Sequence, residues 1–129
     1  MTRTRRSAKT LGTAFERRIA DYLAATLEDD RIDRRAKTGH KDRGDITGIR
    51  IHNQRLVVEC KNCPQHTDLP SWLNEAHIEA GNDDALTGIV VAKRKGVTEP
   101  GRQWVHMTVD DFCALLTGER HGHRKDQIA

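Results

Sequence analysis

Two carboxylates and a lysine are spaced so that they could share one site for a divalent cation. Glu59 and Lys61 are two residues apart in a run rich in β-branched residues, so a strand would place both side chains on one face. Burying such charges is costly unless they are paired or bind a metal. Asp45 opens the preceding predicted strand, and a hairpin would bring it beside Glu59. The spacing therefore predicts a metal site made of two carboxylates, with an amine beside it.

Each of these residues also has a simpler interpretation. Asp45 follows Gly44, and Gly-Asp pairs are common in turns. Glu59 and Lys61 could belong to an ion-pair ladder on an exposed face of a sheet. We favour the metal site because the alternate residues of the same strand are apolar and suited to burial.

An alternative metal site is the Cys-x-x-Cys pair of Cys60 and Cys63, with His66 three residues further on. These residues could bind zinc, but structural zinc sites have four ligands, and no second cysteine pair follows at zinc-finger spacing. The three cysteines are odd in number and predict no disulfide framework. The simpler interpretation is that Cys60 is a small core residue and that Cys63 has no specific role.

Length and charge favour a small nucleic-acid-binding protein. The 129 residues suffice for one domain. No stretch approaches the roughly 20 apolar residues of a membrane span, and the N-terminal residues lack the apolar core of a secretion signal, so we expect a cytoplasmic protein. Residues 1–43 contain 12 Lys and Arg against 7 Asp and Glu, although the whole chain has a net charge of only +3. This basic excess predicts contact with a polyanion, or else a solvated segment that serves solubility.

The apolar pattern predicts an α/β protein with helices on both sides of a small mixed sheet. We expect a basic, flexible arm at residues 1–9, one domain at residues 10–118 and a polar tail at residues 119–129. Within the domain the pattern predicts a helix from about Thr13 to Leu27, strands at 32–37, 45–51, 55–62, 87–93 and 103–108, a helix starting near Pro70, and a last helix capped by Thr108 and Asp111.

Asp45, Glu59 and Lys61 match the motif of the PD-(D/E)xK nuclease superfamily, here as Gly-Asp followed by Glu-Cys-Lys, with Gly44 in place of the usual proline. Within that superfamily the chain is most similar to archaeal-type and phage Holliday junction resolvases. The resemblance covers roughly residues 10–117. It implies a restriction-endonuclease-like fold, in which helices flank a mixed sheet.

The resemblance also implies a reaction, namely metal-dependent hydrolysis of phosphodiesters at four-way DNA junctions, leaving 5′-phosphate and 3′-hydroxyl ends. Mg²⁺ or Mn²⁺ would be the cofactor. Asp45, Glu59 and the backbone carbonyl of Cys60 would be ligands. Lys61 would orient the attacking water or offset charge in the transition state.

The resolvases that this chain resembles carry a glutamate on their first helix, and the matching residue here is Glu16. The resemblance implies that Glu16 is catalytic and holds a second metal or an inner water. The run from Thr13 to Glu16 also fits a capping box, in which Glu16 would only close back on the Thr13 amide. We favour the catalytic role because Glu16 borders the apolar stripe of the helix.

We expect DNA contacts that do not read sequence from the basic arm and from the loop before Asp45. The residues are Arg3, Arg5, Arg6, Lys9, Arg34, Arg35, Lys37, His40, Lys41 and Arg43, and Lys93, Arg94 and Lys95 could add a second patch. Symmetric junction cleavage needs two active sites, which a homodimer supplies most simply. Trp72 and Trp104 are candidates for its interface, although core packing is the simpler prediction for both. The alternative functions are another nuclease of this fold acting on flaps, mismatches or duplex DNA, and a non-catalytic DNA-binding module.

Overall fold

A six-stranded mixed sheet forms the centre of the computed structural model, which describes residues 5–35 and 44–121 and, for residues 5–11, the backbone alone. The strand order is β1-β2-β4-β5-β6, and β3 pairs with β4. The strands are β1 (Asp33–Arg34), β2 (Ile46–Thr47), β3 (Arg50–Ile51), β4 (Gln54–Lys61), β5 (Thr87–Ala92) and β6 (Trp104–His106). β4 and β5 are parallel, and the other pairs are antiparallel. The predicted α/β class, the mixed sheet and the single small domain are confirmed.

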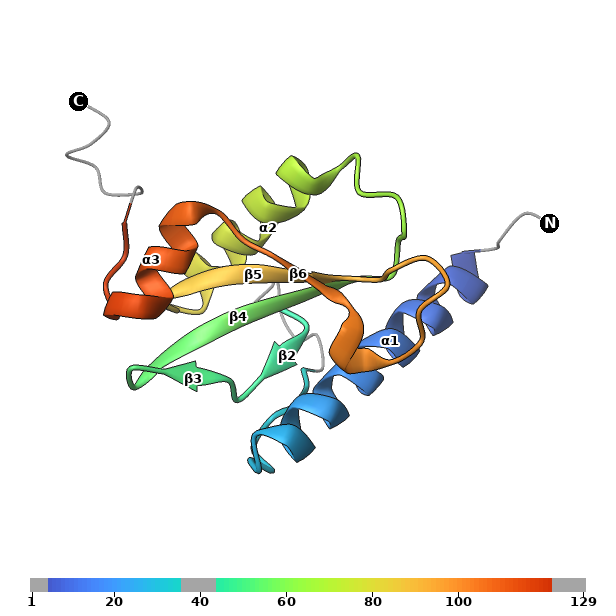
Figure 1. The fold of residues 1–129 in the computed structure, drawn as a ribbon, viewed down its shortest axis with the longest axis horizontal. Coiled ribbons are helices and arrows are strands. Elements are labelled where there is room, and N and C mark those ends of the chain that lie inside the picture. Colours follow the sequence, from blue (N-terminus) through green and yellow to red (C-terminus); the bar gives the residue numbers. More distant parts are fainter. Residues whose placement is uncertain (1–4, 36–43, 122–129) are drawn as a thin grey trace.

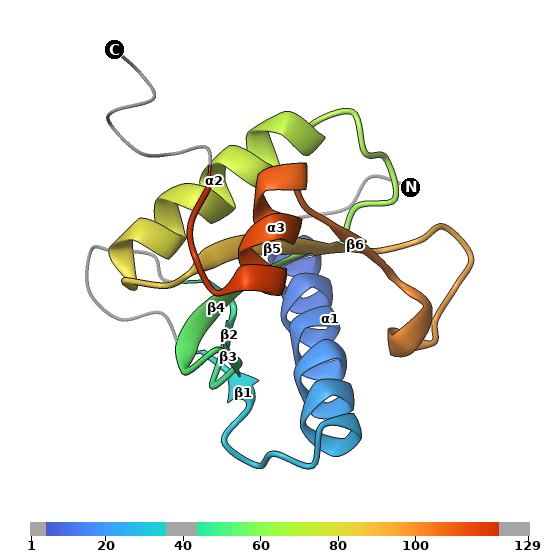
Figure 2. The ribbon, with the colours of Figure 1, turned by 60° about the vertical axis from the view of Figure 1, so that its left-hand side comes forward.

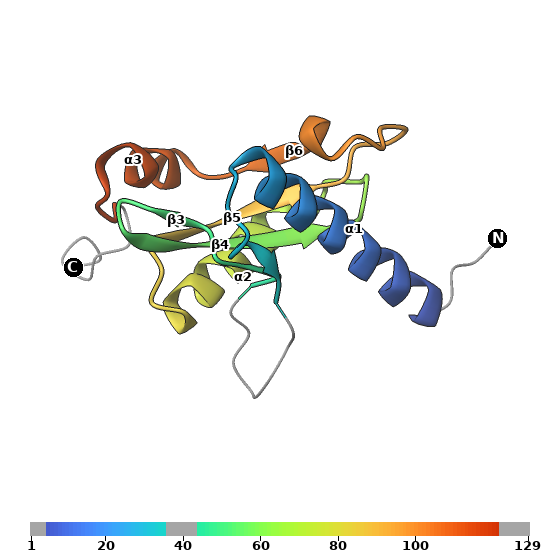
Figure 3. The ribbon, with the colours of Figure 1, turned by 90° about the horizontal axis from the view of Figure 1, so that it is seen from below.

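Helices α1 (Arg5–Thr26) and α2 (Leu69–Asn82) lie on opposite sides of the β4–β5 pair (Figures 1 and 3). Alternate residues of these strands face the two helices, which gives core clusters on both sides of the sheet. The first cluster includes Phe15, Ile19, Val58, Cys60, Ile89 and Val91, and the second consists of Trp72, Ala76, Val90 and Ala92. Because Val58 and Cys60 face α1, the intervening Glu59 and the following Lys61 face α2.

The first helix is longer than the sequence pattern indicates. It begins at Arg5 and not near Thr13, so the backbone of residues 5–9 is helical where we expected a flexible arm. Arg, Ala and Lys are good helix formers, and the segment contains no proline. Thr13 therefore lies inside the helix, and the capping-box interpretation of Glu16 is wrong. Residues 1–4 lie outside the described part of the chain.

The predicted strand at 45–51 is broken into β2 and β3, so four strands and not three precede α2. Gly48, between them, has φ of +90°. His52 and Asn53, which have φ of 51° and 58°, form the tight turn that returns the chain into β4. The predicted turn is thus confirmed, and it sets the register in which Ile51 pairs with Gln54. The break at Gly48 shifts this register by one residue, so that Ile46 pairs with Val58.

The C-terminal part ends in helix α3 (Val109–Thr117), whose predicted capping box is confirmed by hydrogen bonds between Thr108 and Asp111. A short 3-10 turn, η1 (Pro100–Arg102), precedes β6 at the edge of the sheet. Trp72 is 8% exposed and is a core residue as predicted, but Trp104 is 50% exposed, so its predicted core position is wrong. None of the helices in residues 5–35 and 44–121 has the length and hydrophobicity of a bilayer-spanning segment.

Candidate functional site

Asp45 is held against the end of β4 by two backbone contacts. Its amide donates to the carbonyl oxygen of Val58 at 3.1 Å, and its Oδ2 atom accepts from the amide of Cys60 at 2.8 Å. The preceding Gly44 has φ of +97°, and a Cβ there would lie 2.9 Å from Val57 Cγ1. Proline, with φ fixed near −65°, could not adopt this conformation, which explains why this chain has glycine before the aspartate.

Glu59 is buried beside two other carboxyl groups. It is 3% exposed, and burial together with the neighbouring Asp45 and Glu79 raises the pKa of Glu59 far above its ordinary value. Its Oε2 atom is buried and has no hydrogen-bond donor among the described residues. A buried carboxylate normally has such donors, so Glu59 requires a proton or a cation to compensate its charge.

Helix α2 contributes two further glutamates to the same place. Carboxylate oxygens of Glu59, Glu75 and Glu79 lie within 4.8 Å of one another, which could in principle hold a metal ion. Glu75 and Glu79 are four residues apart and so share one face of the helix. Within the part of the chain that the structure describes, this is the one group of three or more His, Cys, Asp and Glu ligand atoms at such distances.

Lys61 lies at the open side of this cluster. Its Nζ donates to both carboxylate oxygens of Glu75, at 3.2 and 3.3 Å, and its side chain is 24% exposed. The strand therefore places Glu59 and Lys61 on the same face, as the sequence spacing predicts. The lysine offsets part of the charge of the carboxylates, and its side chain remains partly exposed.

The thiol of Cys60 belongs to the α1 core cluster, on the face of β4 opposite to Glu59. Burial, and the nearby carboxylates of Asp45, Glu16 and Glu59, raise the pKa of the Cys60 thiol. Its amide points to Asp45, and since the amide and carbonyl of one strand residue point to the same neighbour, so does its carbonyl. The backbone carbonyl of Cys60 thus points to the side of β4 on which Asp45 lies.

The alternative zinc site does not assemble. Cys60 is packed among apolar side chains. The Sγ atom of Cys63 contacts the backbone oxygen of Gln65. His66 packs edge-on against Trp72 and contacts the carbonyl oxygen of Lys93. Ligand atoms of Cys60, Cys63 and His66 do not form a close group in the described structure. The interpretation of Cys60 as a core residue is confirmed.

Glu16 lies on the α1 side of the sheet and is not one of the three grouped glutamates. Its Oε2 atom accepts a 2.9 Å hydrogen bond from Nε of Arg34 in β1. Arg35 is bound in a similar way, to Asp83 at 3.2 Å and to the hydroxyl of Thr47. Arg34 and Arg35, both predicted to bind DNA, would have to leave these partners to contact phosphate.

The other DNA contacts predicted in the N-terminal segment and in the loop before Asp45 lie where no side chain is described. Arg5, Arg6 and Lys9 are in the first two turns of α1, where the structure describes the backbone alone. Arg3, Lys37, His40, Lys41 and Arg43 lie outside the described residues.

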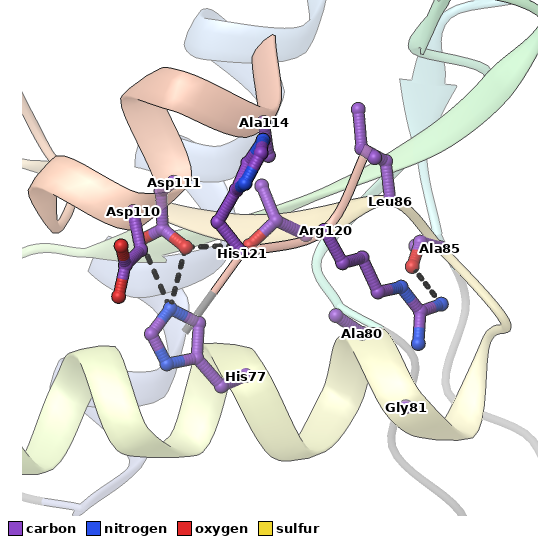
Figure 4. A pocket seen from close by; sticks show the side chains of 11 residues that line it. His77, Ala80, Gly81, Ala85, Leu86, Asp110, Asp111, Ala114, Arg120 and His121 are labelled. Atoms are coloured by element: carbon purple, nitrogen blue, oxygen red, sulfur yellow. Dashed lines mark hydrogen bonds and ion pairs between the residues drawn. The ribbon is translucent and has the colours of Figure 1, made fainter. Parts of the chain in front are cut away.

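Another buried carboxylate, Asp111, lies at a pocket between α2 and α3 (Figure 4). It accepts hydrogen bonds from His77 Nε2 at 2.9 Å, Thr87 Oγ1 at 2.6 Å and the Thr108 amide at 2.9 Å. Burial alone would raise the pKa of Asp111, but these hydrogen bonds lower it to about 2. His77 lies on α2, Thr87 lies on β5 and Thr108 caps α3, so this network joins α3 to α2 and β5.

Sequence reasoning found Asp45, Glu59 and Lys61 but missed Glu75 and Glu79. The signal was present, since Glu79 lies three residues after Ala76 and beside Ala80, within the apolar stripe of α2. A glutamate inside such a stripe must be buried, and it is 2% exposed. No family model, curated protein or solved structure matches this chain.

Proposed function

We propose that this chain is a metal-dependent, structure-selective DNA endonuclease whose substrate is a four-way (Holliday) junction. The observation that carries the proposal is the buried cluster of Asp45, Glu59 and Glu79 beside Lys61. Grouping buried carboxylates is unfavourable unless their charge is compensated. A divalent cation does this, and in metal-dependent hydrolysis of a phosphodiester such a cation lies next to the phosphate.

The proposed fold within the α/β class is the restriction-endonuclease-like one. Two features support it. The motif residues lie on the antiparallel pair of β2 and β4, after a first helix, and α2 then connects β4 to the parallel strand β5. This is the element order that the motif has in the nucleases it resembles.

A Mg²⁺ or Mn²⁺ ion, when bound, would neutralise charge on the phosphate and lower the pKa of a water ligand. The residues present fit such an ion, because the donors are hard oxygens and Glu59 Oε2 lies buried without a hydrogen-bond donor among residues 5–35 and 44–121. One carboxylate oxygen from each of Glu59, Glu75 and Glu79 lies within 4.8 Å of the others, so one cation could be bound by more than one of them. Asp45, Glu59 and the Cys60 carbonyl would hold the ion, with Glu75 or Glu79 beside them.

Lys61 would act on the phosphate and not on the ion. Glu75 holds its ammonium at the edge of the cluster, where it can offset charge that develops on the scissile phosphate. The basic N-terminal segment would contact neighbouring phosphates without reading sequence. Two such sites in a homodimer would cut a junction symmetrically.

The test is cleavage, with Mg²⁺, of a labelled four-way junction beside a flap and a linear duplex of equal length. Paired, symmetric nicks in the junction alone are the expected result. Cutting of the flap or duplex would keep the nuclease and change its substrate, whereas binding without cutting in Mg²⁺ or Mn²⁺ would favour a non-catalytic module.

Asp45→Asn supplies the control, because it removes ligand charge at almost constant volume. We expect cleavage to fall by at least about 100-fold, while DNA binding is kept or becomes tighter. Asp110→Asn makes the same chemical change at an exposed residue of α3 and should leave cleavage unaltered. Normal cleavage by Asp45→Asn would refute the metal assignment.

A further inference from the structure

Trp104 is the largest aromatic side chain exposed in the described structure, with 50% of its surface accessible. The guanidinium carbon of Arg94 lies 4.0 Å from the centre of its ring, a cation–π contact. An exposed indole with an arginine stacked on it is a surface on which an unpaired nucleobase can stack, since every base has a π-face.

The connection between β5 and β6 holds this pair in a defined position. The side chain of Gln103, which is 8% exposed, accepts from the Arg94 amide at 2.7 Å and donates to the carbonyl oxygens of Val97 and Glu99, both at 2.9 Å. The Arg94 side chain donates to the Arg102 carbonyl oxygen at 3.0 Å. The stack is therefore ordered before any ligand arrives, which reduces the entropy cost of binding.

The same connection is anchored to the first helix. A Cβ on Gly101 would lie 2.5 Å from the hydroxyl oxygen of Tyr22, so η1 packs closely against the side chain of Tyr22 on α1. Figure 2 shows this segment, in orange, extending from the end of the sheet past α1. Its base, at Trp104, is thus fixed both to the sheet and to a helix.

Strand register places Trp104 on the same face as the candidate site. Trp104 pairs with Ala92, and Ala92 pairs with Lys61, so these three residues form one row across β6, β5 and β4. Paired residues point to the same face of a sheet, which is the face that carries Glu59. With neighbouring strands about 4.8 Å apart, the Cα atoms of Trp104 and Lys61 are separated by roughly 10 Å. A nucleotide on Trp104 would lie within a few nucleotides of a phosphate at Lys61.

Charge identifies the partner. Residues 93–104 contain four Lys and Arg but a single Glu. Lys95 and Arg102 are exposed around the stack. Two copies of this surface would repel each other, whereas a nucleic acid strand offers both the base for the indole and the phosphates for the cations.

We propose that the Arg94–Trp104 stack binds an unpaired base of a nucleic acid strand that lies across the candidate active site. The inference rests on the proposed function for its choice of substrate, and it adds a specific contact for a nucleotide that is not in a duplex. Such a contact favours branched or frayed DNA over continuous duplex, because only an unpaired base can stack on the indole.

The test uses the emission of Trp104, with Ca²⁺ in place of Mg²⁺ so that no cleavage is required. Trp72 is buried and serves as an internal constant, and Trp104→Phe should abolish any change in emission. We expect single-stranded and branched oligonucleotides to quench the emission, and a blunt, fully paired duplex to leave it unchanged. Trp104→Ala should weaken binding of the branched oligonucleotide by about 5- to 100-fold, and Trp104→Phe by much less, since phenylalanine keeps a stacking surface.

Phe112→Ala is the matched control, because Phe112 is 52% exposed on α3 and should not alter binding. Equal quenching by duplex, equal effects of Trp104→Ala and Phe112→Ala, or no DNA binding would each overturn the proposal. So would a change from dimer to monomer in Trp104→Ala, measured by sedimentation, because it would make Trp104 a contact between copies. Cleavage of a junction without quenching would overturn this inference and leave the proposed function intact. Selective quenching without cleavage in Mg²⁺ would support the stacking contact and overturn the proposed nuclease activity.

Discussion

Helix α2 connects two buried carboxylate sites that differ in how their charge is compensated. Asp111 accepts hydrogen bonds from His77, Thr87 and the Thr108 amide, and these lower its pKa to about 2. Glu59 is equally buried, yet its nearest neighbours are carboxylates, and its pKa is raised. One site is complete without a ligand and stabilises the fold. At the other site, the charge of the carboxylates is compensated only when a proton or a cation is bound. Strongly shifted carboxylates of this kind are typical of functional sites.

The largest expected effect comes from Glu59→Gln. The amide keeps the shape of the side chain, removes a metal ligand and can donate hydrogen bonds to Asp45 and Glu79. We therefore expect cleavage to fall by at least about 100-fold, while the melting temperature stays equal to or rises above that of the wild type. The measurements are single-turnover cleavage and thermal unfolding without metal. A large loss of stability with activity retained would show that Glu59 stabilises the fold and does not take part in cleavage.

Replacing the carboxylate of Asp111 by an amide should lower stability and leave cleavage unchanged. Asp111→Asn loses hydrogen bonds to a charged acceptor and weakens the cap of α3, so we expect the free energy of unfolding to fall by about 1–3 kcal/mol at neutral pH. Cleavage by the folded protein, measured well below the melting temperature, should not change. A loss of activity comparable to that of Glu59→Gln would connect the Asp111 network to the chemistry.

The dependence of stability on acid pH tests the role assigned to Asp111. The pKa of Asp111 is lowered from 3.8 to about 2 by folding, so its stabilising contribution is present above about pH 4 and is lost as the pH falls toward 2. Over that window, the stability of the wild type should decline more steeply than that of Asp111→Asn. Urea unfolding at pH 5, 4 and 3 measures the difference, and parallel curves would contradict the assigned hydrogen bonds.

Glu75→Gln is expected to have the smallest effect on stability. Glu75 forms a partly exposed ion pair with Lys61, with side chains 45% and 24% exposed, and such pairs contribute at most about 1 kcal/mol. If Glu75 mainly positions the lysine, cleavage should fall by less than about tenfold, and Lys61→Ala should lose more. A loss as large as that of Glu59→Gln would instead make Glu75 a metal ligand.

Much of the fold follows from local patterns. The alternation in β4, the turn at His52 and Asn53 and the Thr108–Asp111 cap are each visible within a few residues and are confirmed. The errors occurred where local signals were absent or misleading. The apolar stripe of α1 does not extend back to Arg5, so it does not mark the start of the helix. The pattern of residues 103–108 does not reveal that β6 is an edge strand, which leaves Trp104 exposed.

The candidate site also combines features that local sequence predicts with features that only the tertiary structure shows. The spacing of Glu59 and Lys61 alone determines that both side chains share a face of a strand, and Asp45 joins them through a short hairpin. Glu75 and Glu79 reach them only because β5 pairs in parallel with β4, which requires a crossover that lays α2 over this face. The sequence therefore determined which residues could do chemistry. The tertiary structure decided how many carboxylates are buried together, because desolvation and charge repulsion depend on distances between segments far apart in the chain.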